Sequence, residues 1–177
     1  MSKPSEPAPV QPVVSVFGRD WDAFWPGLLR EMEEVLGPAE DVTEPFPFTE
    51  TDYYDNELGT PIHRRIIAFE GLIDPLRLVD IKLAFNDLEA EYLREDGTRR
   101  VNIDSGILSL ERLVLATGKE FGHRIYLGRG IWADLTLLFQ RGGWRTLPWT
   151  YPDYAGERVQ SILTRVRSAY KAKLRAR

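Results

Sequence analysis

Strand and helix patterns alternate from Val13 to Asp104, and their order restricts the folds open to the chain. An apolar, β-branched run predicts a strand over 13–17, and residues 62–69 and 99–104 also read as strands. Residues 39–48 should be extended because Pro45 and Pro47 force their neighbours out of the helical region. Apolar residues recur at helical spacing over 21–36, after the strand at 13–17, and over 75–92, after the strand at 62–69. The order β, α, β, β, α, β is that of the ferredoxin-like split βαβ pattern. We therefore predict an α+β fold with a ferredoxin-like core.

The rest of the chain predicts an extension of this core by a β-meander and a C-terminal helix. We expect a turn at Asp104–Gly106 and a short helix over 109–117. Glycine turns then separate three strands, over 123–127, 131–140 and 144–147. The last helix begins near Gly156, and its apolar stripe consists of Val159, Ile162, Leu163, Val166, Tyr170 and Leu174. Residues 13–177 would form a single domain after a disordered, proline-rich leader over 1–12.

Several classes of chemistry are excluded by what the sequence lacks. There is no cysteine, so disulfides, thiol catalysis and zinc–thiolate sites are ruled out. The only Gly-Lys pair, Gly118-Lys119, is followed by Glu120, so there is no phosphate-binding P-loop. Two distant histidines make a His-rich metal site unexpected, an oxygen-only Mg²⁺ site stays open, and no cofactor is indicated. No apolar run has the length of a membrane span and no signal peptide is evident, so we expect a soluble cytoplasmic protein.

Charge is unevenly distributed along the chain. Residues 19–57 hold twelve Asp or Glu and two Lys or Arg, whereas residues 141–177 hold nine Lys or Arg and two Asp or Glu. One interpretation is a basic, anion-binding C-terminal helix, which presents Arg165, Lys171, Lys173 and Arg175 to RNA or to a protein partner. The other is that the two segments neutralise each other in the fold or only solvate its surface.

The candidate ligand-binding residues are six polar side chains: Asn102, Asp104, Lys119, His123, Arg124 and Asp134. Asn102 and Asp104 share one face of a strand because they are two residues apart. Since the 99–104 strand and the meander should join one sheet, we predict that these side chains meet at one cavity. The alternative is that Asp104 caps a turn and the others form ordinary ion pairs.

The register of the hairpin around Gly128-Arg129-Gly130 decides which of these side chains can meet. A three-residue loop pairs Leu127 with Ile131, places Arg124 opposite Asp134, and puts Ile125, Leu127 and Leu135 on a buried apolar face. A two-residue loop would instead place Arg124 on the apolar face, where burying its charge is costly. We therefore predict the three-residue loop. His123 then starts the strand on the apolar side, where a backbone partner is expected rather than a catalytic role.

Two aromatic segments lie outside the regular elements, at Tyr53-Tyr54 and over Trp149–Tyr154. Each could form a lid or wall of a binding site. Each could equally serve as a clamp that packs a neighbouring element against the fold. The sequence leaves both interpretations open.

Five motifs together resemble the domain-of-unknown-function family 4416, and the resemblance runs from about Val13 to the C-terminal helix. They are Phe-Pro-Phe-Thr-Glu-Thr-Asp-Tyr-Tyr at 46–54, Val-Asn-Ile-Asp-Ser-Gly at 101–106, Leu-Val-Leu-Ala-Thr at 113–117, His-Arg-Ile-Tyr-Leu at 123–127 and Trp-Thr-Tyr-Pro-Asp-Tyr at 149–154. Ser105 stands where the family usually has Pro, which should loosen the expected turn, and Asp134 stands where Glu is usual. The resemblance implies no activity. Some members are labelled GTP-binding, which the missing P-loop does not support here.

Three hypotheses for the function follow. The first is a binding or enzymatic domain for an anionic, nucleotide-like small molecule, in which Lys and Arg hold the anion and Asp104 and Asp134 hold Mg²⁺ or act as acid and base. The second is an RNA- or protein-binding module that uses the basic C-terminal helix. The third is a scaffold protein whose polar residues are structural. A cavity that joins the six residues would favour the first.

Overall fold

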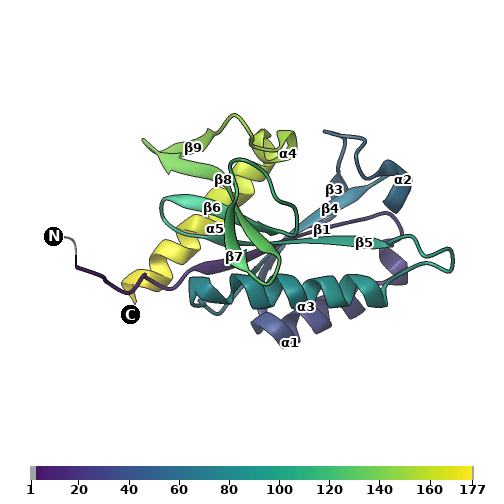
Figure 1. Ribbon diagram of the computed structural model, residues 1–177, viewed down its shortest axis with the longest axis horizontal. Helices are drawn as coiled ribbons and strands as arrows, with labels where there is room; N and C mark the ends of the chain where they lie inside the picture. The colour runs from purple at the N-terminus through teal and green to yellow at the C-terminus, as the bar shows by residue number, and fades with distance from the viewer. Residues whose placement is uncertain (1–2, 177) are drawn as a thin grey trace.

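The computed structural model describes residues 3–176 and shows an α+β fold (Figure 1). In this part of the chain the strands are β1 (Gln11–Gly18), β2 (Ala39–Val42), β3 (Phe46–Pro47), β4 (His63–Phe69), β5 (Val101–Leu108), β6 (Arg112–Thr117), β7 (Ile125–Gly128), β8 (Ile131–Gln140) and β9 (Gly143–Thr146). The five α-helices are α1 (Gly27–Leu36), α2 (Asp55–Leu58), α3 (Leu78–Glu91), α4 (Pro152–Ala155) and α5 (Glu157–Arg175).

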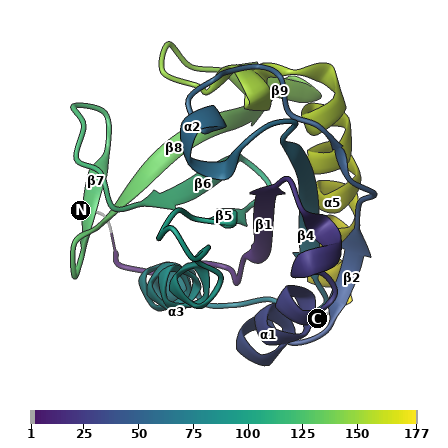
Figure 2. The same ribbon diagram turned by 90° about the vertical axis from the view of Figure 1, so that its right-hand side faces the viewer.

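The nine strands that lie within residues 3–176 form one antiparallel sheet in the order β2-β4-β1-β5-β6-β8-β7, with β3 paired to β4 and β9 to β8. Helices α1 and α3 cover one face, and α5 crosses the other (Figure 2). Alternate residues of β1 point to the two sides, so that Val14 and Val16 pack with Phe85 of α3, whereas Val13 packs with Leu163 of α5. The hydrophobic core therefore consists of two layers, one on each face of the sheet.

Local sequence signals explain the long helices. In α1, Leu28, Met32 and Leu36 are four residues apart and buried, and Gly37 ends the helix with a φ of 83°. Before α3, the Asp74 carboxylate accepts a hydrogen bond from the backbone amide of Leu76 at 2.8 Å. None of the helices in residues 3–176 has the length and apolar character needed to cross a membrane.

Two predictions for the middle of the chain are wrong. The expected turn at Asp104–Gly106 does not exist, because β5 continues to Leu108, and the expected helix over 109–117 is strand β6. Leu113 and Leu115 are two residues apart on β6, and both are buried. A period of two is typical of a strand, although this segment also contains helix-forming residues. Gly106 lies in the strand because β6 passes close to it: a Cβ there would lie 2.8 Å from Leu115 Cδ2.

The register predicted for the β7–β8 hairpin is confirmed in part. Tyr126 pairs with Trp132 and Ile125 with Ala133, which places Arg124 beside Asp134 as expected. The pairing of Leu127 with Ile131 is wrong, because Gly128 takes that place and the register shifts at the tip. The predicted burial of Ile125 and Leu127 is also wrong: Ile125 is 69% exposed, since β7 is an edge strand beyond the helices.

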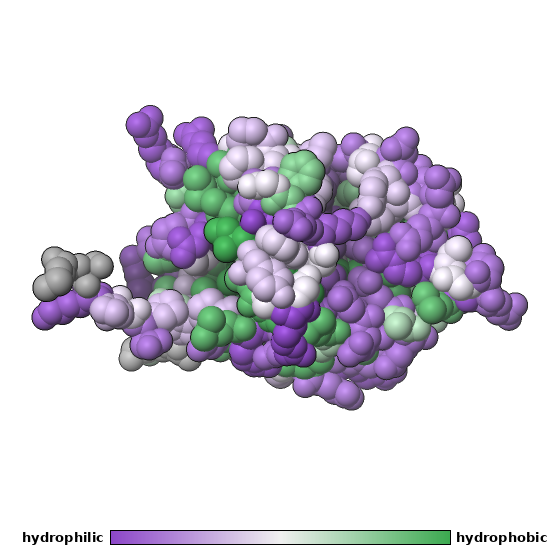
Figure 3. Space-filling view, in the orientation of Figure 1, coloured by the Kyte–Doolittle hydropathy of each residue, from purple (hydrophilic) through white to green (hydrophobic). Residues whose placement is uncertain are grey.

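The C-terminal helix α5 buries Val159, Ile162, Val166 and Tyr170, as predicted. The prediction that Lys173 is exposed is wrong, because its Nζ contacts the Glu40 carboxylate at 2.5 Å and three further oxygens. Arg165 is exposed but bonds Asp41 of β2 at 2.6 Å. The basic C-terminal segment and the acidic N-terminal segment thus neutralise each other in part. On the face in Figure 3 hydrophilic side chains predominate, and hydrophobic ones form smaller patches.

The sheet opens between β5 and β6, and we call this opening the β5–β6 fork. The two strands pair only over residues 106–108 and 113–115, so the first half of β5 has no neighbour on its β6 side. Side chains of α3 take the place of the missing strand there. The Ile103 amide donates to Glu89 Oε1 at 2.5 Å, and Lys82 Nζ donates to the Ile103 carbonyl at 2.9 Å. The backbone amide and carbonyl of Ile103 are thus satisfied while the fork stays open.

Candidate functional site

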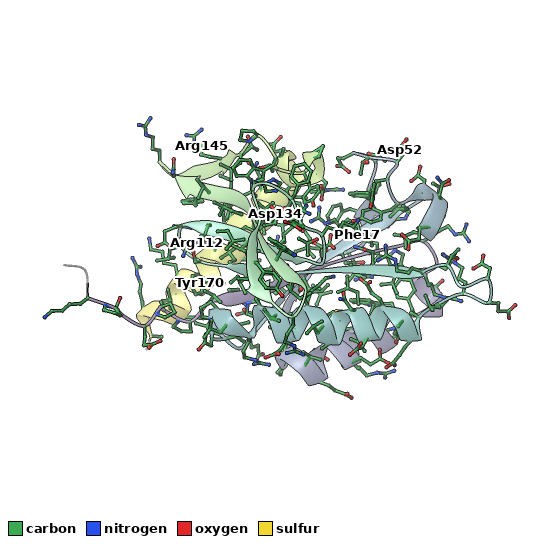
Figure 4. All side chains as sticks on the ribbon, in the orientation of Figure 1. Phe17, Asp52, Arg112, Asp134, Arg145 and Tyr170 are labelled. Atoms are coloured by element: carbon green, nitrogen blue, oxygen red, sulfur yellow. The ribbon has the colours of Figure 1, made fainter. Side chains whose placement is uncertain are left out.

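A cavity of about 800 Å³ occupies the β5–β6 fork. Its floor consists of residues from four strands: Phe17 of β1, Asn102 and Asp104 of β5, Leu115 and Ala116 of β6, and Asp134 of β8. Its walls are loop segments within 48–54 and 117–124 and the start of α4 over 151–154, and α3 closes it from the side. Phe17 and Asp134 mark its position near the middle of the molecule (Figure 4). The cavity therefore lies where the sheet itself supplies polar side chains.

Asp134 organises one wall of the cavity. Its side chain is 2% exposed, and its Oδ2 accepts hydrogen bonds from Arg124 Nε at 2.9 Å and contacts His123 Nε2 at 3.1 Å. The backbone partner expected for His123 is therefore wrong. The imidazole also stacks on Trp149 with ring centres 4.7 Å apart. Arg124 further donates to the Tyr151 hydroxyl at 2.6 Å, so its guanidinium positions both Asp134 and Tyr151.

Arg99, which the sequence analysis did not include in the site, organises the opposite wall. It donates to both oxygens of Glu57 at 2.5 and 2.6 Å, to Glu89 at 3.1 Å and to Asn102 Oδ1 at 2.9 Å. These contacts raise the pKa of Arg99 and lower the pKa of Glu57. Burial, opposed by Lys82, Arg99 and the backbone bond, raises the pKa of Glu89. The guanidinium thus uses four of its five N–H donors on protein acceptors and also fixes the Asn102 amide.

Asp104 points into the cavity from the middle of β5. Asn102 Nδ2 donates to its Oδ1 at 3.0 Å, and among residues 3–176 no Lys, Arg or His side chain forms an ion pair with it. Its negative charge adds to burial in raising the pKa values of Tyr54 and Tyr154. These phenols therefore stay neutral and act as hydrogen-bonding groups. The Asp104 carboxylate is free to accept further hydrogen bonds.

Lys119, in the segment after β6, also borders the cavity. Its ammonium contacts the Tyr53 hydroxyl and lies 4.8 Å from the centre of that ring. Within the described part of the chain it forms no ion pair with a carboxylate. Tyr53 and Tyr54 thus form a wall of the cavity, one of the two roles left open by the sequence. Lys119 is thus an exposed cation at this cavity that has no carboxylate partner among residues 3–176.

A buried ion pair supports the cavity from behind. Arg64 is fully buried, donates to Asp153 Oδ2 at 2.7 Å and to Ser15 Oγ at 2.8 Å, and lies over the Tyr154 ring. Sequence reasoning missed Arg64. The signal was present, however, because Arg64 is in phase with Ile66 on β4 and so faces the interior.

The structure brings five of the six candidate residues to the cavity, namely Asn102, Asp104, Lys119, Arg124 and Asp134. His123 lies behind this layer and contacts the cavity through Asp134. Among residues 3–176, no group of three His, Cys, Asp or Glu side chains is placed to hold a metal ion. The arrangement can bind a polar organic molecule through one free carboxylate, one free ammonium and several aromatic rings.

The chain matches a family that is defined by sequence. The model described as domain of unknown function (DUF4416) matches residues 8–170, and the chain belongs to this family. The comparison with curated proteins gives no match, and neither does the comparison with solved structures.

Proposed function

We propose that this protein binds a small organic anion in the fork cavity, with Asn102, Asp104, Lys119, Arg124 and Asp134 around it. The observation that carries the proposal is that Lys119, without a carboxylate partner, borders a cavity of about 800 Å³. This volume is within the range of small-molecule sites and is sufficient for a ligand of nucleotide size. Aromatic rings, among them Phe17, Tyr54 and Tyr151, would contact the apolar or planar part of the ligand.

The charges around the cavity favour a ligand with a single anionic group. Six acidic side chains line it (Glu50, Glu89, Asp104, Glu120, Asp134 and Asp153), against four basic ones (Lys82, Arg99, Lys119 and Arg124). Arg99 and Arg124 are paired with carboxylates and Lys82 donates to a buried backbone carbonyl, whereas the ammonium of exposed Lys119 contacts only the Tyr53 hydroxyl among residues 3–176. A polyphosphate would meet net repulsion here. A phosphate monoester or a carboxylate could form one ion pair with Lys119 and avoid that cost.

A thermal-shift screen tests this proposal. Nucleoside monophosphates, sugar phosphates and small carboxylates should include a compound that raises the melting temperature of the wild-type protein in a saturable way. Lys119→Met should abolish the shift, because it removes the available cation. Lys171→Met, which changes an exposed lysine on α5, is the matched control and should leave the shift unchanged. A shift that persists in Lys119→Met would contradict this assignment.

The alternative function is RNA or protein binding by the basic C-terminal helix. The contacts of Arg165 with Asp41 and of Lys173 with Glu40 leave fewer free charges on α5 than the sequence suggests. If salt-dependent RNA binding occurs there, charge reversal at Arg165, Lys171 and Lys173 should abolish it. Tight binding that survives this change would exclude the helix.

We also propose that the first six main elements form a ferredoxin-like core. The strand order β2-β4-β1-β5 with antiparallel neighbours supports this. So does the position of α1 and α3 on the same face. A solved structure of any family member, compared with known ferredoxin-like folds, would test it.

A further inference from the structure

We propose that the ligand of the fork cavity also carries a protonated amine or guanidinium group, and that Asp104 binds it. This inference rests on the proposed function and specifies it: the ligand would have an anionic end at Lys119 and a cationic end at Asp104. The argument uses the hydrogen bonds of Asp104, the engagement of the surrounding cations and the aromatic lining.

The first step is that the protein leaves part of Asp104 unsatisfied. A carboxylate can accept about four hydrogen bonds. Within residues 3–176 the side chain of Asp104 accepts one, from Asn102 Nδ2 at 3.0 Å. Asp104 is only partly exposed, so water cannot surround it as it would on an open surface. A charge-assisted donor from a ligand would therefore gain more here than at the surface.

The second step is that no cation of residues 3–176 pairs with Asp104: Lys82 bonds the Ile103 carbonyl, Lys119 contacts Tyr53, and the nearby arginines bond other carboxylates. Arg64 bonds Asp153, Arg124 bonds Asp134, and Arg99 bonds Glu57 and Glu89. Each of these pairs would have to break before its cation could reach Asp104. For the two buried pairs, Arg64–Asp153 and Arg124–Asp134, breaking the pair is costly because it leaves the other charge unpaired. In this arrangement the protein leaves the charge of Asp104 unpaired, and a cationic group of a ligand can supply the partner.

The third step concerns the aromatic rings that border the same space. Phe17, Tyr54, Tyr151 and Tyr154 line the cavity, and Asp104 influences the ionisation of all three tyrosines. Their pKa values are raised, mainly by burial, so the phenols remain neutral. Neutral aromatic rings attract an organic cation through their π-faces. A carboxylate among such rings matches an alkylammonium or a guanidinium group better than a second anion.

The experiment compares ω-aminoalkyl phosphates of increasing chain length with alkyl phosphates of the same length. NMR chemical-shift titrations of the wild-type protein, Asp104→Asn and Asp87→Asn give each affinity. We expect one chain length at which the wild-type protein binds the amine-bearing compound about tenfold more tightly. Asp104→Asn should remove this preference and retain the affinity for the alkyl phosphate. Asp87→Asn, at an exposed position on α3 outside the cavity, should behave like wild type.

The outcomes separate the two proposals. Equal affinities for both series at every length, or a preference that persists in Asp104→Asn, would overturn the role of Asp104 but leave anion binding intact. If neither series binds in a saturable way, both proposals fail. Circular dichroism and the melting temperature of Asp104→Asn show whether the variant remains folded, and Asp104→Glu, which keeps the charge, should restore part of the preference.

Discussion

The Arg64–Asp153 ion pair offers the sharpest test of how the cavity is supported. We consider Arg64→Met, which has similar length without charge, together with Asp153→Asn and the double variant. Both partners are buried, with side-chain exposures of 0% and 7%, and their atoms are 2.7 Å apart. Arg64 also donates to Ser15 and lies over Tyr154, so its removal affects several contacts at once.

The magnitude follows from what each change leaves behind. Arg64→Met leaves a buried carboxylate without a cation, and Asp153→Asn leaves a buried guanidinium without an anion. Each should lower the free energy of unfolding by about 3–5 kcal/mol. For a chain of this size that is a fall in melting temperature on the order of 10 °C. The double variant buries neither charge and should lose much less than the sum of the two single losses.

Urea unfolding followed by tryptophan fluorescence measures these free energies. The loss of unfolding free energy in Arg64→Met should also become smaller as the pH falls. Burial raises the pKa of Asp153 and Arg64 opposes this effect, so without Arg64 the carboxyl group is protonated, and thus neutral, at a higher pH. If the two single losses simply add in the double variant, the two charges do not stabilise the fold through each other, and the reasoning is refuted.

Three further predictions concern the fork and the C-terminal helix. Gly106→Ala should lower the free energy of unfolding in urea by about 2 kcal/mol, because its Cβ would lie 2.9 Å from the Val114 carbonyl. Gly118→Ala should change this free energy little, because a Cβ at Gly118 would have no atom within 4 Å. Lys173→Met should cost about 1 kcal/mol through its lost contacts with Glu40 and Gln11, and Lys171→Met should be neutral by the same measurement. The pKa of Glu89 is raised above its ordinary 4.5, so the contribution of Glu89 to the free energy of unfolding decreases as the pH rises through the raised value. Glu89→Gln should therefore flatten this part of the pH profile of unfolding. An unchanged profile would contradict the assignment.

Much of the fold could be predicted because its signals are local. Periodicity located α1, α3 and α5, and Gly37 and Asp74 marked helix ends through their backbone chemistry. The β6 strand was missed because its burial comes from pairing with β5 and β8, which propensity does not record. The turn at Asp104–Gly106 was predicted from residues that favour turns. In the structure Gly106 serves a different purpose, the close approach of β6.

The meeting of polar residues at one cavity could be predicted in outline because several of them lie on strands of the same sheet. The Arg124–Asp134 contact followed from hairpin register alone. The contribution of Arg99 and Arg64 could not be inferred in the same way, since Glu57, Glu89 and Asp153 come from distant segments of the chain. For the same reason sequence could not show that Lys119 is free of carboxylates while Arg124 is fully engaged.

The open fork gives one backbone amide an unusual environment. In a continuous sheet, an amide hydrogen exchanges with solvent when neighbouring strands separate. The Ile103 amide is instead held by the Glu89 carboxylate of α3. Its exchange rate should therefore follow the docking of one helix side chain and the charge that this side chain carries. When acid protonates Glu89, the acceptor of this hydrogen bond becomes weaker. The exchange rate of the Ile103 amide therefore reports, from the floor of the cavity, whether α3 is packed against β5.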